Sequence, residues 1–200
     1  MRQLIKTSAS KAVIDVLKSG GMGVMPTDTI YGILGPAGSK KTVERIYRLK
    51  KRESGKPFII LIASVSDLAK FNIRLSWREK KFLREVWPGK ISVVLPCHCK
   101  KLIYLHRGKN TLAFRMPKPV WLRSLLRKTG PLVAPSANIS GKQPAKNIRE
   151  AIKYFGSRVD FYVDGGTRNG SPSALIALKK NGVKIIRSGK LTQVPKMSIF

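Results

Sequence analysis

Two segments that lie far apart in the chain combine hydroxyl, amide and basic side chains in patterns that could bind a polyphosphate. The first is residues 26–58, which begins with Pro-Thr-Asp-Thr-Ile-Tyr-Gly and carries Lys50, Arg52 and Lys56 just before its final Pro-Phe. The second is residues 135–141, Pro-Ser-Ala-Asn-Ile-Ser-Gly. Arginine offers a planar fork to phosphate oxygens and lysine a point charge, so this spacing of cations suits a triphosphate.

The basic cluster of Lys50, Arg52 and Lys56 also has a plainer interpretation, as the solvated end of a helix. Cations stabilise the negative end of a helix dipole, and the chain carries 40 Lys and Arg residues against 10 Asp and Glu residues. Its formal net charge of +30 attracts polyanions over long range, whereas a general lysine bias would spread charge evenly over the surface. On charge alone, a nucleotide or nucleic-acid partner and a compositional bias explain the chain equally well.

Four uncharged polar side chains accompany this cluster. Thr27 and Thr29 follow a predicted strand, which is where ligand sites lie in α/β sheets. Ser136 and Asn138 also follow a predicted strand, and their spacing of two residues places them on one side of an extended backbone. Each pair on its own could be turn chemistry. Together with the basic cluster, the two pairs predict one site for a polyphosphate and a small polar substrate.

Two other motifs give weaker signals. The glycine-rich residues 164–173 could expose backbone N–H groups to an anion, but they match neither a Walker nor a dinucleotide fingerprint. Cys97, His98, Cys99 and His106 could be drawn as a zinc site, but their spacing departs from the usual ligand gaps, and we expect buried thiols and surface histidines instead. No Ser-His-Asp order or paired carboxylates favours another enzyme class. Because the chain has 10 Asp and Glu residues and no metal-binding cluster of acids, we expect no protein-held metal, and we expect any Mg²⁺ to be bound by substrate phosphates.

The elements that must position these residues alternate between strand-like and helix-like patterns, which indicates an α/β fold. Several predicted strands follow one another without a helix between them, so we expect a mixed sheet. Ser8 or Ser10 can cap the first helix, which Gly20-Gly21 ends. The other expected helices cover residues 39–52, 77–87, 120–128 and 147–155, and the expected strands cover residues 22–25, 58–63, 91–95, 111–115, 132–134, 161–163, 174–178 and 183–186.

Apart from its charge, the composition is that of an ordinary globular protein. Hydrophobic residues make up 42% of the 200 positions, which is enough for a core. No repeat or change of composition marks a second domain, so residues 1–200 are expected to form one domain. The chain has two cysteines, no leader-like apolar region at its start, and no apolar stretch of the roughly 20 residues that span a bilayer. These features predict a soluble, cytoplasmic protein without a membrane partner.

Taken in order, these segments resemble the YrdC/Sua5 family of threonylcarbamoyl-adenylate synthases, which begin t6A modification of tRNA. Further markers of the resemblance are Trp87-Pro88-Gly89, residues 113–117 (Ala-Phe-Arg-Met-Pro), residues 164–166 (Asp-Gly-Gly) and residues 187–189 (Arg-Ser-Gly). The match covers essentially the whole chain, which ends where the short, YrdC-type members end. The resemblance implies a twisted mixed β-sheet with flanking helices, curled around a large basic concave cavity.

The resemblance also implies a reaction, in which L-threonine, bicarbonate and ATP give threonylcarbamoyl-AMP and pyrophosphate. Mg²⁺ would be carried by the ATP phosphates. At matching positions, the residues implied to bind threonine are Thr29, Arg115, Ser136 and Ser173, and those implied to bind ATP are Lys50, Arg52, Lys56, Thr111, Asn138 and Arg187, with Lys50 and Arg52 as the catalytic pair. Weak affinity for tRNA or double-stranded RNA and functional coupling to the t6A transferase complex are implied as well.

Three positions depart from the family pattern, and two other functions are alternatives to the synthase. The usual Ser-Thr-x-x-Asp reads Ser-Ala-Leu-Ile-Ala at residues 173–177, and Lys146 stands where a small hydroxyl residue is common. One alternative is a protein that binds tRNA or double-stranded RNA without synthase activity, although no known RNA-binding signature is present. The other is a YciO-like paralogue with another substrate, although such members tend to lose the Lys-x-Arg and Ser-x-Asn pairs.

Overall fold

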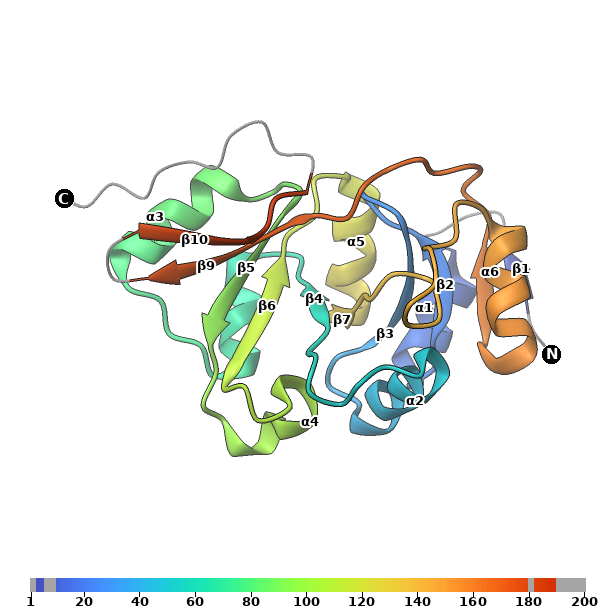
Figure 1. Cartoon of the computed structure of the whole chain (residues 1–200), viewed down its shortest axis with the longest axis horizontal. Helices are drawn as coiled ribbons and strands as arrows, with labels where there is room; N and C mark the ends of the chain where they lie inside the picture. Colours follow the sequence, from blue (N-terminus) through green and yellow to red (C-terminus); the bar gives the residue numbers. More distant parts are fainter. Residues whose placement is uncertain (1–2, 6–9, 180–181, 190–200) are drawn as a thin grey trace.

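The computed structural model describes residues 3–5, 10–179 and 182–189. Within these residues, ten strands form one twisted mixed sheet in the order β1-β8-β2-β3-β7-β4-β6-β5-β9-β10 (Figure 1). The strands are β1 (Gln3–Ile5), β2 (Gly23–Pro26), β3 (Tyr31–Pro36), β4 (Ile59–Leu61), β5 (Ile91–Pro96), β6 (Thr111–Arg115), β7 (Leu132–Val133), β8 (Phe161–Val163), β9 (Ala174–Lys179) and β10 (Gly182–Arg187). The α-helices are α1 (Lys11–Lys18), α2 (Lys40–Lys50), α3 (Trp77–Val86), α4 (Ile103–His106), α5 (Val120–Thr129) and α6 (Ile148–Phe155), and the 3-10 helices are η1 (Val65–Phe71), η2 (Lys100–Leu102) and η3 (Gly156–Arg158).

Strand direction in the centre of the sheet brings the two polar segments of the sequence together. β7 runs antiparallel to β4, so the residues that follow β7 lie beside the residues that precede β4. The Ala134 amide accordingly donates to the Ile59 carbonyl at 2.9 Å. An isolated antiparallel bridge also joins Ser136 to Gly32 of β3. Residues 135–141 are thereby placed between the start of β3 and the start of β4.

Local chemistry explains where several helices begin and end. Side chains of Ser10, Ser39, Ser76 and Asn147 accept a hydrogen bond from a backbone N–H in the first turn of α1, α2, α3 and α6, as expected of N-caps. Ser8, the other predicted cap of α1, lies outside the described residues. After α2, Lys51 adopts a left-handed conformation with φ of 49°, so the chain turns sharply before Arg52.

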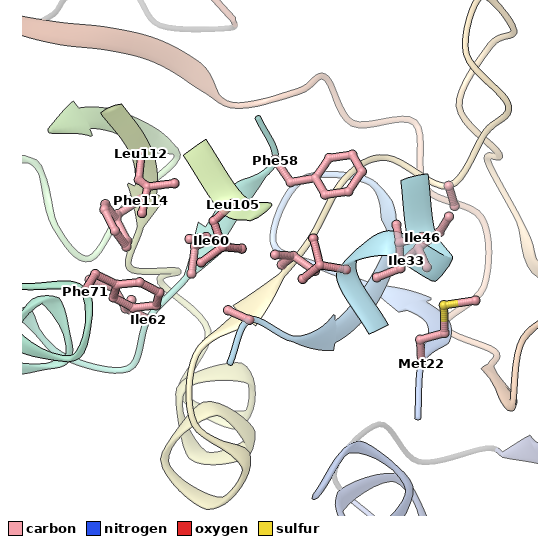
Figure 2. Close-up of a cluster of buried hydrophobic side chains, with 14 of the residues drawn as sticks. Met22, Ile33, Ile46, Phe58, Ile60, Ile62, Phe71, Leu105, Leu112 and Phe114 are labelled. Atoms are coloured by element: carbon pink, nitrogen blue, oxygen red, sulfur yellow. The ribbon is translucent and has the colours of Figure 1, made fainter. Parts of the chain in front are cut away.

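Both faces of the sheet carry a hydrophobic cluster. Successive side chains of a strand point to opposite faces, and Leu34 and Leu61 pack on one face with side chains of α1 and α5. Ile33 and Ile60 point to the other face and join a larger cluster with side chains of α2, α3 and α6. Figure 2 shows Ile33 and Ile60 within this larger cluster. The site described below lies on the Leu34 face.

The expected helices and strands are all present, but the prediction missed β1, β3, α4 and the 3-10 helices. The most consequential omission is β3, because the polar pattern of residues 26–32 does not indicate that a strand begins at Tyr31. Turn-forming residues before β3 and two glycines within it hide its strand signal. Gly35 is needed there, since an added Cβ would lie 2.7 Å from Thr42 Cγ2 of α2. None of the helices in the described ranges has the length and apolar character that crossing a bilayer requires.

Candidate active site

A cavity opens on the Leu34 face of the sheet, beyond the part that α1 and α5 cover. Its floor includes Ile59 of β4, Arg115 of β6 and Leu175 of β9, whose side chains share this face. Its empty volume is about 760 Å³, counting the space that is open to solvent. The walls come from residues 27, 29–32, 57–58, 134–136 and 172–173, together with Arg52 and Arg187.

Three arginines reach this cavity from distant parts of the chain: Arg52 follows α2, Arg115 ends β6 and Arg187 ends β10. Arg52 Nε donates to the Lys56 carbonyl at 3.0 Å, and Arg187 donates through Nε and Nη2 to the Ser173 carbonyl at 3.1 and 2.9 Å. Burial first, and then the charges of Arg115 and Arg52, lower the pKa of Arg187. The guanidinium groups are therefore close enough to repel one another, and an anion bound among them would relieve that repulsion.

Asp28 lies behind Arg115 as its counter-ion. Asp28 Oδ1 is 2.9 Å from Arg115 Nη2, and the two side chains are 1% and 4% exposed. Burial lowers the pKa of Arg115, and the Asp28 charge opposes that shift. Asp28 Oδ2 and Arg115 Nε are buried without a hydrogen-bond partner, so the pair keeps unused hydrogen-bonding capacity beside the cavity. The role of Asp28 was missed from the sequence, although an acid between two threonines is a signal in a chain with 10 acids.

Some hydroxyl groups of the site stabilise turns and others line the cavity, which are the two roles that the sequence allows. Thr27 Oγ1 donates to the Ile30 carbonyl at 2.7 Å and accepts from the Thr29 amide at 3.2 Å, so it shapes the turn between β2 and β3. Thr29 Oγ1 lies 3.1 Å from Thr27 Oγ1, and Thr29 lines the cavity. Ser173 also lines it, with Oγ 2.9 Å from Ser92 Oγ of β5. Nothing in the sequence indicated this contact with Ser92.

Lys50 is enclosed behind the cavity wall. The residue is 1% exposed, and its Nζ donates to the Ser136 carbonyl at 2.5 Å, the Asn138 carbonyl at 2.6 Å and Asn138 Oδ1 at 3.1 Å. Burial, and then the charge of Arg52, lower the pKa of Lys50 to about 7, while the three oxygen acceptors favour the ammonium form. The N–H groups expected to meet a phosphate instead tie α2 to the segment that follows β7.

Ser136 and Asn138 lie on one side of their segment, as predicted. Ser136 Oγ donates to Asn138 Oδ1 at 2.6 Å, and Ser136 lines the cavity. Asn138 is outside the lining, and its Nδ2 donates to the carbonyls of Ile139 and Lys142 at 3.0 and 2.6 Å. The amide therefore holds the loop together and presents Ser136 to the cavity.

Lys56 and Thr111 are also outside the cavity lining. Lys56 is exposed, with Nζ 2.9 Å from Glu53 Oε2. Thr111 begins β6 on the same face as Ala113 and Arg115, beyond the end of the floor. The predicted site residues that the cavity does bring together are Thr29, Arg52, Arg115, Ser136, Ser173 and Arg187.

Residues 164–173 are held against the turn between β2 and β3. Tyr31 Oη accepts from the Gly165 amide and donates to the Gly166 carbonyl, each at 2.8 Å. An added Cβ at Gly170 would lie 2.0 Å from the Thr29 carbonyl oxygen, so this close approach requires glycine. The glycines of this segment therefore allow it to pack beside Thr29 at the cavity wall.

The cysteine and histidine residues lie away from the cavity. Cys97 is buried and His98 is exposed, as expected. Cys99 is partly exposed and His106 is 3% exposed, so the expectation is wrong for these two residues. His106 Nδ1 accepts from the Gly108 amide at 3.2 Å, and this hydrogen bond closes the turn that follows α4. Among the residues that the structure describes, no group of three or more His, Cys, Asp and Glu side chains could hold a metal ion.

Comparisons with known proteins agree with the resemblance. The Sua5/YciO/YrdC family model, described as "Telomere recombination", matches residues 15–189. The threonylcarbamoyl-AMP synthase of Bacillus subtilis is 31% identical over 89% of this chain and 52% of its own length. That of Pyrococcus abyssi is 30% identical over 96% of this chain and 57% of its own length. That of Nitrosococcus oceani is 30% identical over 89% of this chain and 91% of its own length.

Solved structures show the same fold. The crystal structure of P. abyssi Sua5 complexed with L-threonine has a TM-score of 0.84 at 27% identity, covering 96% of this chain and 58% of that chain. Escherichia coli YciO has a TM-score of 0.81 at 21% identity, which is a likeness of fold alone. The chain spans about half the length of the B. subtilis and P. abyssi relatives. The match to the family model over most of its length establishes that the chain belongs to the Sua5/YciO/YrdC family.

Proposed function

We propose that the protein is an L-threonylcarbamoyladenylate synthase, which forms threonylcarbamoyl-AMP and pyrophosphate from L-threonine, bicarbonate and ATP. The observation that carries this proposal is the convergence of Arg52, Arg115 and Arg187 with hydroxyl side chains on one cavity. Such a lining suits two anionic substrates that must be aligned. Family membership, and relatives that bear the synthase name at about 30% identity, support the same activity.

The two substrates are assigned to different parts of the cavity. Arg115 receives the threonine carboxylate, since a guanidinium fork matches a carboxylate and Asp28 already orients this one. The hydroxyl-bearing residues that complete the threonine site are Thr29, Ser136 and Ser173. They add short hydrogen-bonding groups that suit a small polar amino acid and fix its position.

ATP is assigned to Arg52 and Arg187, whose guanidinium groups hold the phosphates. Lys56, next to the wall residue Pro57, and Thr111, at the start of β6, extend this side beyond the lining. Lys50 and Asn138 contribute from behind the wall by holding the backbone around Ser136. The positions that depart from the family pattern, Ala174, Ala177 and Lys146, are all outside the lining.

The chemistry needs alignment and charge neutralisation more than covalent help from the protein. The neutral amine of threonine combines with bicarbonate to form a carbamate and water. A carbamate oxygen then attacks the α-phosphorus, a new P–O bond forms, and the bond to pyrophosphate breaks. Negative charge develops on the transferring phosphorus and on the leaving group, and positioned cations stabilise it. Arg52 and Arg187 are placed for that role.

Mg²⁺ enters this proposal as part of the substrate MgATP. The described residues contain no cluster of acidic side chains that could bind it, and Asp28, the acid beside the cavity, pairs with Arg115. Because Mg²⁺ often binds through substrate phosphates, we infer that the phosphates of ATP carry the ion into the site.

Pyrophosphate release tests the proposal. The protein is incubated with MgATP and bicarbonate, with and without L-threonine, and with L-serine in a parallel reaction. Release that requires both bicarbonate and threonine is expected. If folded protein releases no threonine-dependent pyrophosphate but retains tRNA, the RNA-binding alternative replaces the synthase. If it binds ATP and responds to another amino acid or acceptor, a YciO-like paralogue is the better assignment.

We also infer that the product serves tRNA modification. A carbamoyl adenylate is a reactive mixed anhydride, so a transferase must consume it, and transfer to adenosine in tRNA would place the reaction in the cytoplasm. The formal net charge of +30 gives weak affinity for tRNA or double-stranded RNA a physical basis. Adding purified transferase components and unmodified tRNA should yield t6A; its absence despite adenylate formation would separate the two steps.

A further inference from the structure

The orientation of Arg52 depends on a stack of planar side chains that begins at the cavity. Arg52 Cζ lies 5.4 Å from the centroid of the Phe58 ring. Phe58 stacks on Tyr47, with ring centroids 4.0 Å apart and 23° between the planes. Arg107 Cζ lies 3.8 Å from the Tyr47 centroid, and because Phe58 covers one face of Tyr47, Arg107 occupies the other. The stack therefore runs in the order Arg52, Phe58, Tyr47 and Arg107.

This stack connects the cavity to the loop that follows α4. Tyr47 lies on α2, Phe58 precedes β4 and Arg107 follows α4. Tyr47 and Phe58 are 5% and 3% exposed, and Figure 2 shows Phe58 within the hydrophobic core. Arg52 lines the cavity, whereas Arg107 is not part of the lining. Arg107 can therefore affect a ligand in the cavity only indirectly.

A hydrogen-bonded link runs beside the stack. The Lys56 carbonyl accepts from Tyr47 Oη and from Arg52 Nε, each at 3.0 Å. Tyr47 thus restrains the Arg52 guanidinium in two ways, through the Phe58 ring and through this carbonyl. A shift of the Tyr47 ring would disturb both supports at once.

The far end of the stack is held by an ion pair. Arg107 Nη1 lies 2.8 Å from Glu44 Oε1 of α2, and the Arg107 side chain is 13% exposed. Arg107 Nε and Nη2 are buried without a hydrogen-bond partner, so the guanidinium has given up part of its hydration. Contact with the face of Tyr47 offsets that cost, because an aromatic face attracts a cation most strongly when water is excluded.

We propose that Arg107 is a positioning residue that acts through the aromatic pair to hold Arg52 in the orientation that receives the phosphates of ATP. The inference rests on the proposed function, which assigns those phosphates to Arg52. A guanidinium whose plane is already set loses less freedom when it forms a bidentate contact. Arg107 therefore affects the use of ATP and leaves the binding of threonine unchanged.

Steady-state kinetics of Arg107→Met test this role. We expect kcat/KM for ATP to fall about fivefold, while KM for L-threonine stays at the wild-type value. Lys109→Met is the matched control, because Lys109 is exposed in the same loop and its loss removes the same charge; it should behave as wild type. Arg107→Lys keeps the charge but loses the planar group, so it should fall between Arg107→Met and wild type.

A double variant separates positioning from long-range charge. If Arg107 acts through Arg52, then Arg52→Ala/Arg107→Met has the same kcat/KM for ATP as Arg52→Ala alone, since the two residues form one chain of contacts. A further fivefold loss in the double variant would overturn the proposal, and so would an equal loss in Lys109→Met.

Binding of inorganic tripolyphosphate, measured by calorimetry, distinguishes this inference from the proposed function. Arg107→Met should weaken binding about fivefold in the wild-type background and have no effect in the Arg52→Ala background. A wild-type protein that binds tripolyphosphate through Arg52 but forms no adenylate would refute the synthase function and leave the positioning role in place. Equal affinity of wild type and Arg107→Met would overturn the positioning role, whatever the activity.

Discussion

The basic cluster at the end of α2 and the three arginines of the cavity show opposite relations between distance along the chain and distance in space. Lys50, Arg52 and Lys56 are close in sequence, yet they lie in the interior, at the cavity and in solvent respectively. Arg52, Arg115 and Arg187 are far apart in sequence, yet they line one cavity. Which cations meet is therefore decided by the helical period and the strand order, and not by proximity along the chain.

The helical period accounts for the interior position of Lys50. It follows Val43 and Ile46 at spacings that place it on the buried stripe of α2, whereas Arg48 and Lys51 are exposed. The left-handed conformation of Lys51 then ends the helix, so Arg52 leaves in a new direction and reaches the cavity. The end of α2 thus places Lys50 in the interior, where it binds backbone carbonyls, and Arg52 at the cavity.

Among the arginines of the cavity, replacing Arg115 should have the largest effect on the free energy of unfolding. Arg115→Met leaves the Asp28 carboxylate buried without its partner, and we expect the free energy of unfolding to fall by about 3–5 kcal/mol. Chemical denaturation measures the change. Asp28→Asn/Arg115→Met removes the unpaired charge and should recover much of the loss; a double variant as unstable as Arg115→Met would show that the ion pair is not the cause.

Arg52→Ala should separate activity from stability. We expect kcat/KM for ATP to fall about 100-fold, or about 2.7 kcal/mol, because a cation is lost from the phosphate side of the cavity. The free energy of unfolding should change by less than about 1 kcal/mol, since the side chain contributes a contact with the Phe58 ring and an exposed hydrogen bond to the Lys56 carbonyl. Arg48→Ala replaces an exposed arginine in the last turn of α2; it is the control and should keep wild-type kinetics. Comparable activity of the two variants would contradict the assignment of Arg52.

The interior position of Lys50 should make the free energy of unfolding depend on pH. Its pKa of about 7 lies below the ordinary lysine value of 10.5, so the unfolded chain binds more protons than the folded protein between these values. The contribution of Lys50 to the free energy of unfolding therefore rises with pH across this interval. We expect the free energy of unfolding of the wild type, measured by urea denaturation relative to that of Lys50→Met, to rise by about 1 kcal/mol from pH 7 to pH 8. A constant difference would mean that the carbonyl acceptors keep the ammonium charged.

Lys56 should give the smallest effect. Its ion pair with Glu53 is exposed, so Lys56→Ala should change the free energy of unfolding by less than about 0.5 kcal/mol. We expect a loss of about threefold or less in kcat/KM for ATP, and this loss should shrink as salt is raised. A large, salt-independent loss would place Lys56 among the cations in direct contact with the phosphates.

Particular residues show which features of the site could be predicted from the sequence. The spacing of Ser136 and Asn138 predicted their shared side, and the hydrogen bond between them confirms it. The apolar stripe of α2 contained enough information to predict the burial of Lys50, but the cluster of cations around it favoured a phosphate site instead. Asp28 and Arg107 were not assigned roles, because their partners come from β6 and α2 and no local pattern marks such contacts.

The sequence by itself determined the α/β class, most helix and strand positions, and the identity of the polar segments that reach the site. These follow from period, caps and turn residues, which act over a few positions. Only the tertiary structure decided that Lys50 Nζ meets the carbonyls of the segment that follows β7, that Asp28 pairs with Arg115, and that an aromatic stack supports Arg52. Each of these depends on which strands are neighbours and on which faces the helices cover, and that choice is made by packing across the whole chain.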